Sequence, residues 1–153
     1  GITGQHSGTT LTEVYSEGSV EGNRKVGGVA GVSEEPISLA YSTGSVTGSD
    51  IVGGLIGEQG REPISNSYAT GSVTATSGST VGGVAGMSDE AYTNVYWDTS
   101  STGQTNSDAS GETGATGLTT SEMQGSSASS NMSGFDFTTN WSTVTGDYPE
   151  LQD

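Results

Sequence analysis

One glycine-rich phrase occurs three times in this chain at almost constant spacing. The copies are YSEGSVEGNRKVGGVAG, YSTGSVTGSDIVGGLIG and YATGSVTATSGSTVGGVAG. Their tyrosines, together with a fourth, are separated by 26, 27 and 28 residues, at Tyr15, Tyr41, Tyr68 and Tyr96. A period of this length indicates a repeat architecture, in which each unit buries its few apolar residues against the next unit.

Alignment on the tyrosines places similar residues at equivalent positions. Four residues before each tyrosine stand Leu11, Ile37, Ile64 and Tyr92. Three residues after it stand Gly18, Gly44 and Gly71, and five residues after it stand Val20, Val46 and Val73. The longer copies carry their extra residues in the polar runs 58–61 and 76–80, as loops allow. We expect the equivalent positions to stack as ladders.

The repeat predicts an all-β fold, a parallel β-helix or β-solenoid of about 26–29 residues per coil. The segment PISLAYS alternates Ile37, Leu39 and Tyr41 with smaller neighbours, which favours a strand with one buried face. Two further short strands are expected around the SV and VGGLIG segments of each copy, giving three strands and three corners per coil. Val52 and Leu55 have opposite parity, so the face of the third strand stays open, and a glycine bulge would reconcile the two.

Composition alone would predict a disordered chain. Leu, Ile, Val and Phe make up 24 of 153 residues and the net charge is −15, a combination typical of disorder. Placed at fixed intervals, however, the same few apolar residues form one continuous column. The 26 glycines then serve tight corners rather than flexibility.

The three phrases resemble the GLUG repeat, over roughly residues 11–97. That family recurs in large secreted bacterial and archaeal surface proteins, including adhesins and regions beside secreted immunoglobulin-cleaving metallopeptidases. The resemblance implies a β-solenoid and a surface location, and it implies no activity. One departure is Ala75, which stands where the first two copies have Gly22 and Gly48 and puts the corner of the third coil in question.

We divide the chain into solenoid coils at 1–97 and a C-terminal loop and capping segment at 98–153, within one structural unit. Residues 98–117 hold almost no large apolar side chain and are expected to form a surface loop. Thr119 and Glu122 have capping-box spacing, which predicts a short helix. A solenoid needs its open end covered, and the late aromatic residues suit that cap, with Tyr96 and Trp97 joining it to the last coil.

The N-terminus shows no such cap. The chain begins without Met or a signal peptide, and its first coil is already under way. We expect a C-terminal piece of a longer secreted protein, and an arbitrary boundary of the sequence at Gly1 fits equally well.

Eighteen acidic residues stand against three basic ones. Phosphate binding needs clusters of Lys and Arg, so we expect no nucleic-acid or anionic-lipid partner, and no apolar stretch suits insertion in a membrane. Molar salt screens the self-repulsion of such a surface, which favours a halophilic source over an ordinary acidic secreted protein. The chain has no cysteine, in keeping with stability from stacking.

The search for chemistry gives no catalytic residue and no cofactor. His6 is the sole histidine and is expected to be an ordinary surface residue, and no H-E-x-x-H motif is present. An acidic ridge is expected after each VGG strand, where it is solvated, holds calcium or, least favoured, supplies a glycosidase pair. Its members are Glu34, Glu35, Glu58, Glu62, Asp89 and Glu90.

Three further acids, Asp98, Asp108 and Glu112, lack the spacing of a calcium loop, so we assign no metal. Asn131 and Asn140 each begin an N-x-[ST] triplet and are candidate glycosylation sites.

The sequence therefore favours a non-enzymatic extracellular structural or adhesive module. Its partners would be other parts of a longer chain or neighbouring subunits, and a surface protein or glycan whose identity the sequence does not give. Two alternatives stay open. One is a receptor-binding spike or fibre domain of a virus or secretion device, and the other is a polysaccharide-active β-helix enzyme.

Overall fold

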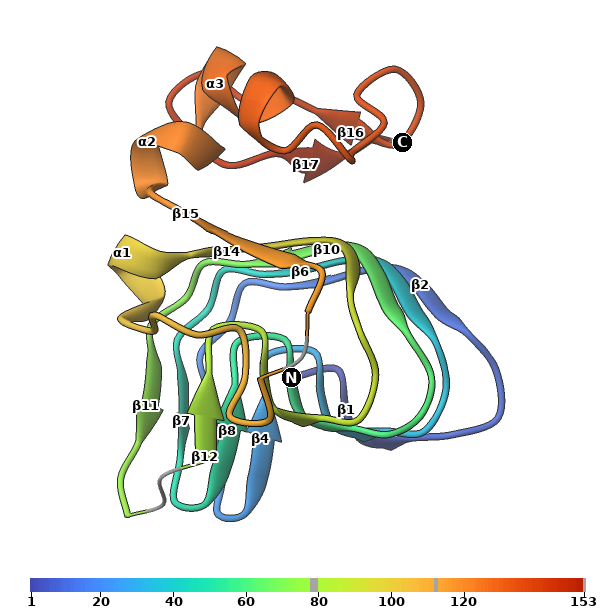
Figure 1. Cartoon of the computed structure of the whole chain (residues 1–153), viewed down its shortest axis with the longest axis vertical. Coiled ribbons are helices and arrows are strands. Elements are labelled where there is room, and N and C mark those ends of the chain that lie inside the picture. The colour runs from blue at the N-terminus through green and yellow to red at the C-terminus, as the bar shows by residue number, and fades with distance from the viewer. Residues whose placement is uncertain (78–79, 112, 153) are drawn as a thin grey trace.

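The chain folds into a parallel β-solenoid of about three coils with short helices near its C-terminus. The computed structural model describes residues 1–77, 80–111 and 113–152. The coils nest one behind another, and the C-terminal segment lies over one side of them (Figure 1). The predicted fold class is confirmed.

Each coil contributes one strand to each of four parallel sheets. The first sheet contains β1 (Thr3–His6), β5 (Ala30–Ser33), β9 (Ile56–Gln59) and β13 (Ala85–Ser88). The second contains β2 (Leu11–Ser16), β6 (Ile37–Ser42), β10 (Ile64–Ala69), β14 (Thr93–Asp98) and β15 (Ala115–Leu118). The third contains β3 (Val20–Glu21), β7 (Val46–Gly48) and β11 (Val73–Ala75), and the fourth β4 (Lys25–Gly27), β8 (Ile51–Gly53) and β12 (Thr80–Gly82).

The expectation of three strands per coil is wrong, because the VGGLIG segment is two strands in different sheets. β8 ends at Gly53 and β9 begins at Ile56, so a corner lies at Gly54 and Leu55. The corner reverses the inward-facing parity, and this explains why Val52 and Leu55 are both fully buried. No bulge is needed there.

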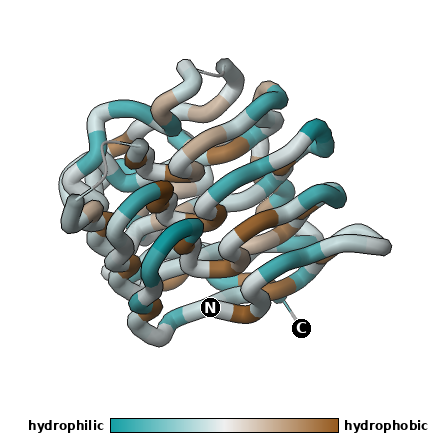
Figure 2. Tube along the Cα trace, turned by 90° about the horizontal axis from the view of Figure 1, so that it is seen from below, coloured by the Kyte–Doolittle hydropathy of each residue, from teal (hydrophilic) through white to brown (hydrophobic). Residues whose placement is uncertain are grey.

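The ladders predicted from the repeat are present in register. Ile37 pairs with Leu11 and Ile64, and Val46 pairs with Val20 and Val73. Viewed from below, the coils form parallel rungs (Figure 2). Ala75 pairs with Gly48 in the ordinary register, so the third coil keeps its strand at this departure from the repeat. Gly78 and Ser79, part of the longest insertion, lie outside the described residues.

Two apolar columns fill the solenoid. The wider one lies between the first and second sheets and includes the ladder of Ile37 and Ile64 and the corner residues Val29, Leu55 and Val84. The narrower one lies between the third and fourth sheets and consists chiefly of valines, Val26, Val46, Val52 and Val73. Stacking therefore gives a chain poor in apolar residues a continuous core.

The tyrosines stack, but outside the solenoid rather than on its buried interior face. Leu39 has a left-handed φ of 50°, and Glu13, Asn66 and Asn94 share that conformation at the equivalent position of their coils. This residue interrupts the alternation, so that Ile37 and Ala40 face the interior column whereas Leu39 and Tyr41 pack in the outer cluster. The predicted shared face of Ile37, Leu39 and Tyr41 is therefore wrong.

The loop expected at 98–117 instead stacks on the last coil. Val84 and Ala85 donate backbone hydrogen bonds to the carbonyl of Ser107, and β15 continues the second sheet beside β14. Within this stretch lies α1 (Thr99–Thr102). The C-terminal end of the solenoid is thus covered by an incomplete further coil, as its open edges require.

The remaining C-terminal segment packs on the outer face of the second sheet (Figure 1). It contains α2 (Thr120–Met123), α3 (Gly125–Asn131) and the antiparallel pair β16 (Trp141–Ser142) and β17 (Glu150–Leu151). The capping box predicted at Thr119 and Glu122 opens α2. None of the helices in the described ranges has the length and apolar character to cross a membrane.

Candidate functional site

The stacked tyrosines form the floor of the candidate site. The ring centroids of Tyr15 and Tyr41 are 4.9 Å apart with an interplanar angle of 5°, and those of Tyr41 and Tyr68 are 5.1 Å apart at 2°. The spacing follows from the solenoid, since parallel strands of adjacent coils lie about 4.8 Å apart. One side chain per coil thus builds a continuous aromatic surface.

The C-terminal segment covers most of this surface. Trp141 lies against Tyr41 and Tyr68, and the Tyr68 hydroxyl donates a 2.6 Å hydrogen bond to the carbonyl of Pro149. At the other end Phe135 packs edge-on against Tyr96, whose hydroxyl accepts a hydrogen bond from the Gly134 amide. Tyr15 is left uncovered, with 55% of its surface exposed.

A groove of about 550 Å³ opens where the cover ends. Its walls are formed by β2 and the residue after it, by Tyr41 on β6, and by β17 and the residue after it. The lining residues are Glu13, Tyr15, Glu17, Tyr41, Glu150, Leu151 and Gln152. A smaller hollow of about 210 Å³ shares Glu17, Tyr41 and Glu150 with it and adds Asp147. Every ionisable side chain among these lining residues is a carboxylate or a phenol.

Burial and the surrounding carboxylates raise the pKa values of two of the stacked tyrosines, Tyr41 and Tyr68. The pKa of Tyr41 is raised to about 12, chiefly by burial. Electrostatic interactions with Glu17, Tyr15 and Glu150 add to the increase. Burial is also the main reason why the pKa of Tyr68 lies well above its usual value. The groove therefore presents negative carboxylates and neutral phenols, which attract cations, can hydrogen bond to hydroxyl-rich ligands and repel phosphate.

We expect the protein to lose stability between pH 10 and pH 12. Because the folded pKa of Tyr41 is about 12 and the unfolded value is 10, the unfolded chain releases this proton first as the pH rises. The stabilisation is complete below pH 10 and is lost through that window. Thermal unfolding followed alongside phenolate absorbance would measure it. Tyr41→Phe, which removes the hydroxyl and keeps the ring, should shrink the loss, and an unchanged unfolding midpoint across the window would contradict the assignment.

The acids expected as a ridge do not gather into a metal site. Glu58 pairs with Lys25, with 2.8 Å between Oε2 and Nζ, and the Glu35 carboxylate accepts a hydrogen bond from the Gly8 amide. The other four acids lie in the equivalent corner of successive coils, after β5, β9 or β13. They are Glu34, Glu62, Asp89 and Glu90. Across the described part of the chain, no three His, Asp or Glu side chains meet in a group able to hold a metal ion.

Asp98 and Asp108, considered for calcium, are buried and bind protein groups instead. Asp98 caps α1 through the amides of Ser100 and Ser101 and accepts a 2.7 Å hydrogen bond from Tyr148. Burial alone would raise the pKa of Asp98, but these hydrogen bonds and one from Thr120 lower it. Asp108 accepts hydrogen bonds from Tyr92, Ser107 and the Gly111 amide. Glu112 lies outside the described residues.

The two candidate glycosylation sites are both on the C-terminal segment. Asn131, at the end of α3, is exposed, and its amide donates to the carbonyls of Glu122 and Ser127. Asn140 is partly exposed next to Trp141. His6 lies on β1 and is partly buried. It is not among the residues that line the groove. These sites stay predictions.

Sequence reasoning missed the groove. Glu13 and Glu17 flank Tyr15 within the single stretch TEVYSEG, and this clustering of acids around a repeat tyrosine was a readable signal. The third carboxylate, Glu150, is distant in the sequence and reaches the groove only because β17 lies across the tyrosine face. No spacing rule connects these residues.

Comparison with known proteins gives one informative match. No model of a known protein family matches the chain, and no solved structure matches it. The GLUG resemblance therefore rests on the repeats alone. Over 80 residues, half of this chain, the sequence is 45% identical to halomucin of Haloquadratum walsbyi, and the aligned part is 1% of halomucin. The chain is a β-solenoid segment, and half of it is similar to a small part of halomucin.

Proposed function

We propose that this chain is a non-enzymatic structural segment of a large extracellular surface protein, in which a rigid β-solenoid presents its lateral face to other molecules. The observation that carries the proposal is the 45% identity to part of halomucin, combined with coils that stack in register. The positions that repeat along this chain are the ones that pair between coils, as in repeat proteins that gain their stability from contacts between neighbouring units.

The charge of the chain supports a saline habitat. With 18 acidic and three basic residues, the surface repels itself at low ionic strength, and molar salt shortens the screening length to about 3 Å. The described ion pairs do little to relieve this repulsion, since Lys25 with Glu58 is a partly exposed pair of modest value. A halophilic source follows naturally from these charges.

An adhesive role would use the groove beside Tyr15. Its exposed aromatic ring and three carboxylates suit a sugar or a cationic group, because sugars stack on aromatic rings and hydrogen bond to carboxylates. The same carboxylates disfavour nucleic acid and anionic lipid. The ligand of this groove would therefore be a glycan or a cationic group of a protein on a neighbouring surface.

Antibody labelling tests the proposed location. An antibody raised against the chain should label intact, unpermeabilised cells of the source organism grown at their own salinity, with an antibody to a cytoplasmic protein as control. Labelling only after permeabilisation would contradict the proposal. In parallel, purified chain incubated with acidic glycans in molar salt should release no sugar, and released sugar would favour the polysaccharide-active enzyme. A trimer in light scattering would favour the spike or fibre domain.

A further inference from the structure

The two ends of the solenoid differ sharply. At the C-terminal end, residues 99–111 and 113–118 cover the last coil through backbone and side-chain hydrogen bonds to strands of three sheets and to Gly83, which directly follows β12. These include the bond from Gln104 Nε2 to the Val73 carbonyl, from the Gly83 amide to Asn106, from the Ala109 amide to Gly86, and the pairing of β15 with β14. At the N-terminal end, β1, β2, β3 and β4 each have a partner strand on one side only.

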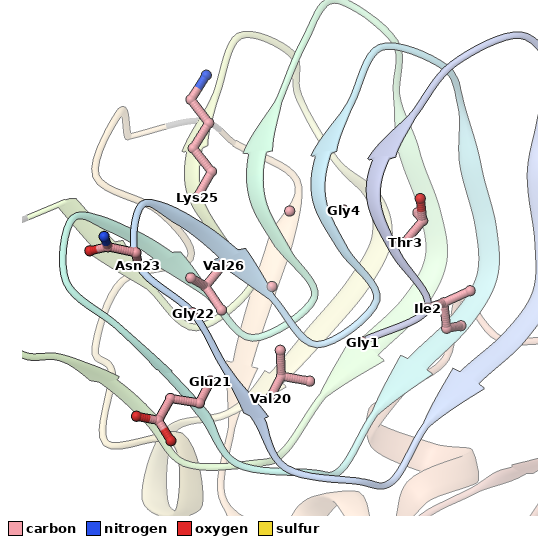
Figure 3. A pocket seen from close by; sticks show the side chains of 12 residues that line it. Gly1, Ile2, Thr3, Gly4, Val20, Glu21, Gly22, Asn23, Lys25 and Val26 are labelled. Atoms are coloured by element: carbon pink, nitrogen blue, oxygen red, sulfur yellow. The ribbon is translucent and has the colours of Figure 1, made fainter.

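The N-terminal face, made of β1–β4, also contains a hollow with a partly apolar lining. A cavity of about 260 Å³ opens there between Val20, Val26 and the glycines of β1 and β4. Figure 3 shows Val20, Val26 and Ile2 around this opening, whereas Lys25 extends away from it. Ile2 and Tyr15, exposed by 44% and 55%, belong to the same coil, although their equivalents Leu55 and Tyr68 are almost fully buried.

The glycines of the first coil give an independent observation. A Cβ added to Gly44 would overlap the carbonyl oxygen of Gly18, and one added to Gly71 would overlap that of Gly44. Each of these glycines is therefore required by the coil on its N-terminal side. Gly18 occupies the same position of the first coil, yet a Cβ there meets nothing within 4 Å and its φ is not in the left-handed region.

A second set of glycines repeats the observation. A Cβ on Gly31 would lie 2.6 Å from the carbonyl oxygen of Gly4, and one on Gly57 would lie 2.6 Å from that of Gly31. Gly4 is the equivalent residue of β1, by the pairing of Thr3 with Ala30 and of Gln5 with Val32. A Cβ on Gly4 again meets nothing within 4 Å. Two positions are thus glycine where only a neighbour on the N-terminal face would require it.

We propose that the N-terminal face is an interaction surface for one further coil of the same repeat type, stacked in parallel register on β1–β4. Such a coil continues the established interface between coils, pairs four open strand edges at once, places an aromatic ring over Tyr15 and fills the cavity between Val20 and Val26. A second copy of this chain does not supply it in parallel register, because its C-terminal end is already covered. The proposal does not depend on the structural role proposed above. Because the added coil covers the ring of Tyr15, it and an adhesive use of that exposed ring exclude each other.

The test adds one coil and asks whether Gly18 becomes essential. A copy of residues 28–53 placed directly before Gly1 creates the junction Gly-Gly-Ile-Thr-Gly, which matches Gly53–Gly57 at all three glycines and at apolar Leu55, with Thr3 in place of Ile56. In the 153-residue chain, Gly18→Ala should leave Tm unchanged, whereas Gly44→Ala should lower it by about 10 °C. In the extended chain, Gly18→Ala should lower Tm as much as Gly44→Ala does, and the amides of β2 and β3 should gain protection from hydrogen exchange.

Three results would overturn the proposal. One is that Gly18→Ala remains harmless in the extended chain and the exchange of β2 and β3 is unaltered. Another is that the extended chain is less stable than the 153-residue chain. The last is a concentration-dependent dimer of the 153-residue chain in light scattering that the added coil abolishes, since this would place a second copy on the face.

Discussion

Gly53→Ala should destabilise the protein by about 3 kcal/mol or more, one of the largest effects available to a single added methyl group. A Cβ at Gly53 would overlap the carbonyl oxygen of Ile56 in its own coil and the backbone of Ala85 and Gly86 in the next coil. Backbone atoms hydrogen-bonded on both sides cannot move aside cheaply. For a chain of this length we expect Tm to fall by about 6–12 °C, measurable by circular dichroism.

Gly4→Ala is the matched control for Gly53→Ala. Both glycines lie in solenoid strands or at their ends, and neither has a left-handed φ, but nothing lies within 4 Å of a Cβ at Gly4. The control should unfold at the temperature of the parent chain. Equal Tm values for the two variants would mean that the coils have room at the corner, and the account of the glycines as packing residues would fail.

Trp141→Ala should release the C-terminal segment from the tyrosine face at a cost of about 3–5 kcal/mol. The Trp141 ring is fully buried and stacks on Phe135, with 4.5 Å between centroids, and it also lies against Tyr41 and Tyr68. Its loss removes the centre of this cluster. Limited proteolysis should then cut between residues 119 and 152 while amides of the solenoid strands stay protected from exchange. Loss of burial should also lower the pKa of Tyr68.

Two variants control this experiment. Trp141→Phe keeps an aromatic ring and should retain most of the stability, since no described group accepts a hydrogen bond from the indole Nε1. Tyr15→Ala removes a ring that is exposed by 55% and should not expose the C-terminal segment to protease. If Trp141→Ala melts as a single cooperative unit with normal protease resistance, the segment does not depend on this ring for its attachment.

The repeat spacing predicted the solenoid and most of its ladders correctly. Strictly spaced residues such as Ile37, Ile64 and Val46 pair as the alignment expects, because a coil of constant length brings the same position into contact with itself in the next coil. The need for a cover at the C-terminal end followed from the same argument. These conclusions needed only the order of the residues.

The path within one coil could not be predicted in the same way. The corner at Leu55 and the left-handed φ of Leu39 each reverse the parity of the inward-facing residues, and Leu39 is an ordinary residue with no local signal for that conformation. Period-two reasoning therefore placed the tyrosines on the wrong face. The polar stretch after α1 lacks large apolar residues, which predicts a surface loop, but its backbone forms hydrogen bonds with the last coil.

The candidate groove depended on contacts between distant segments. The sequence shows Glu13 and Glu17 on either side of Tyr15. Glu150 joins them only because Trp141 packs on the tyrosines and brings the C-terminal segment to this face. Apolar burial of this kind is non-directional, so residue types alone do not say which face the C-terminal segment covers.

The sequence by itself determined that the chain stacks coil on coil, because residues repeated at a fixed interval can only satisfy one another by lying side by side along an axis. It also determined the acidic surface and the glycine corners. Only the tertiary structure decided that the tyrosines face outward and that the last segment covers three of them and leaves Tyr15 open. It also decided that a Cβ on Gly18 or Gly4 would meet no other atom within 4 Å. Those outcomes depend on backbone conformation at single residues and on long-range packing, and neither is written in the period of the repeat.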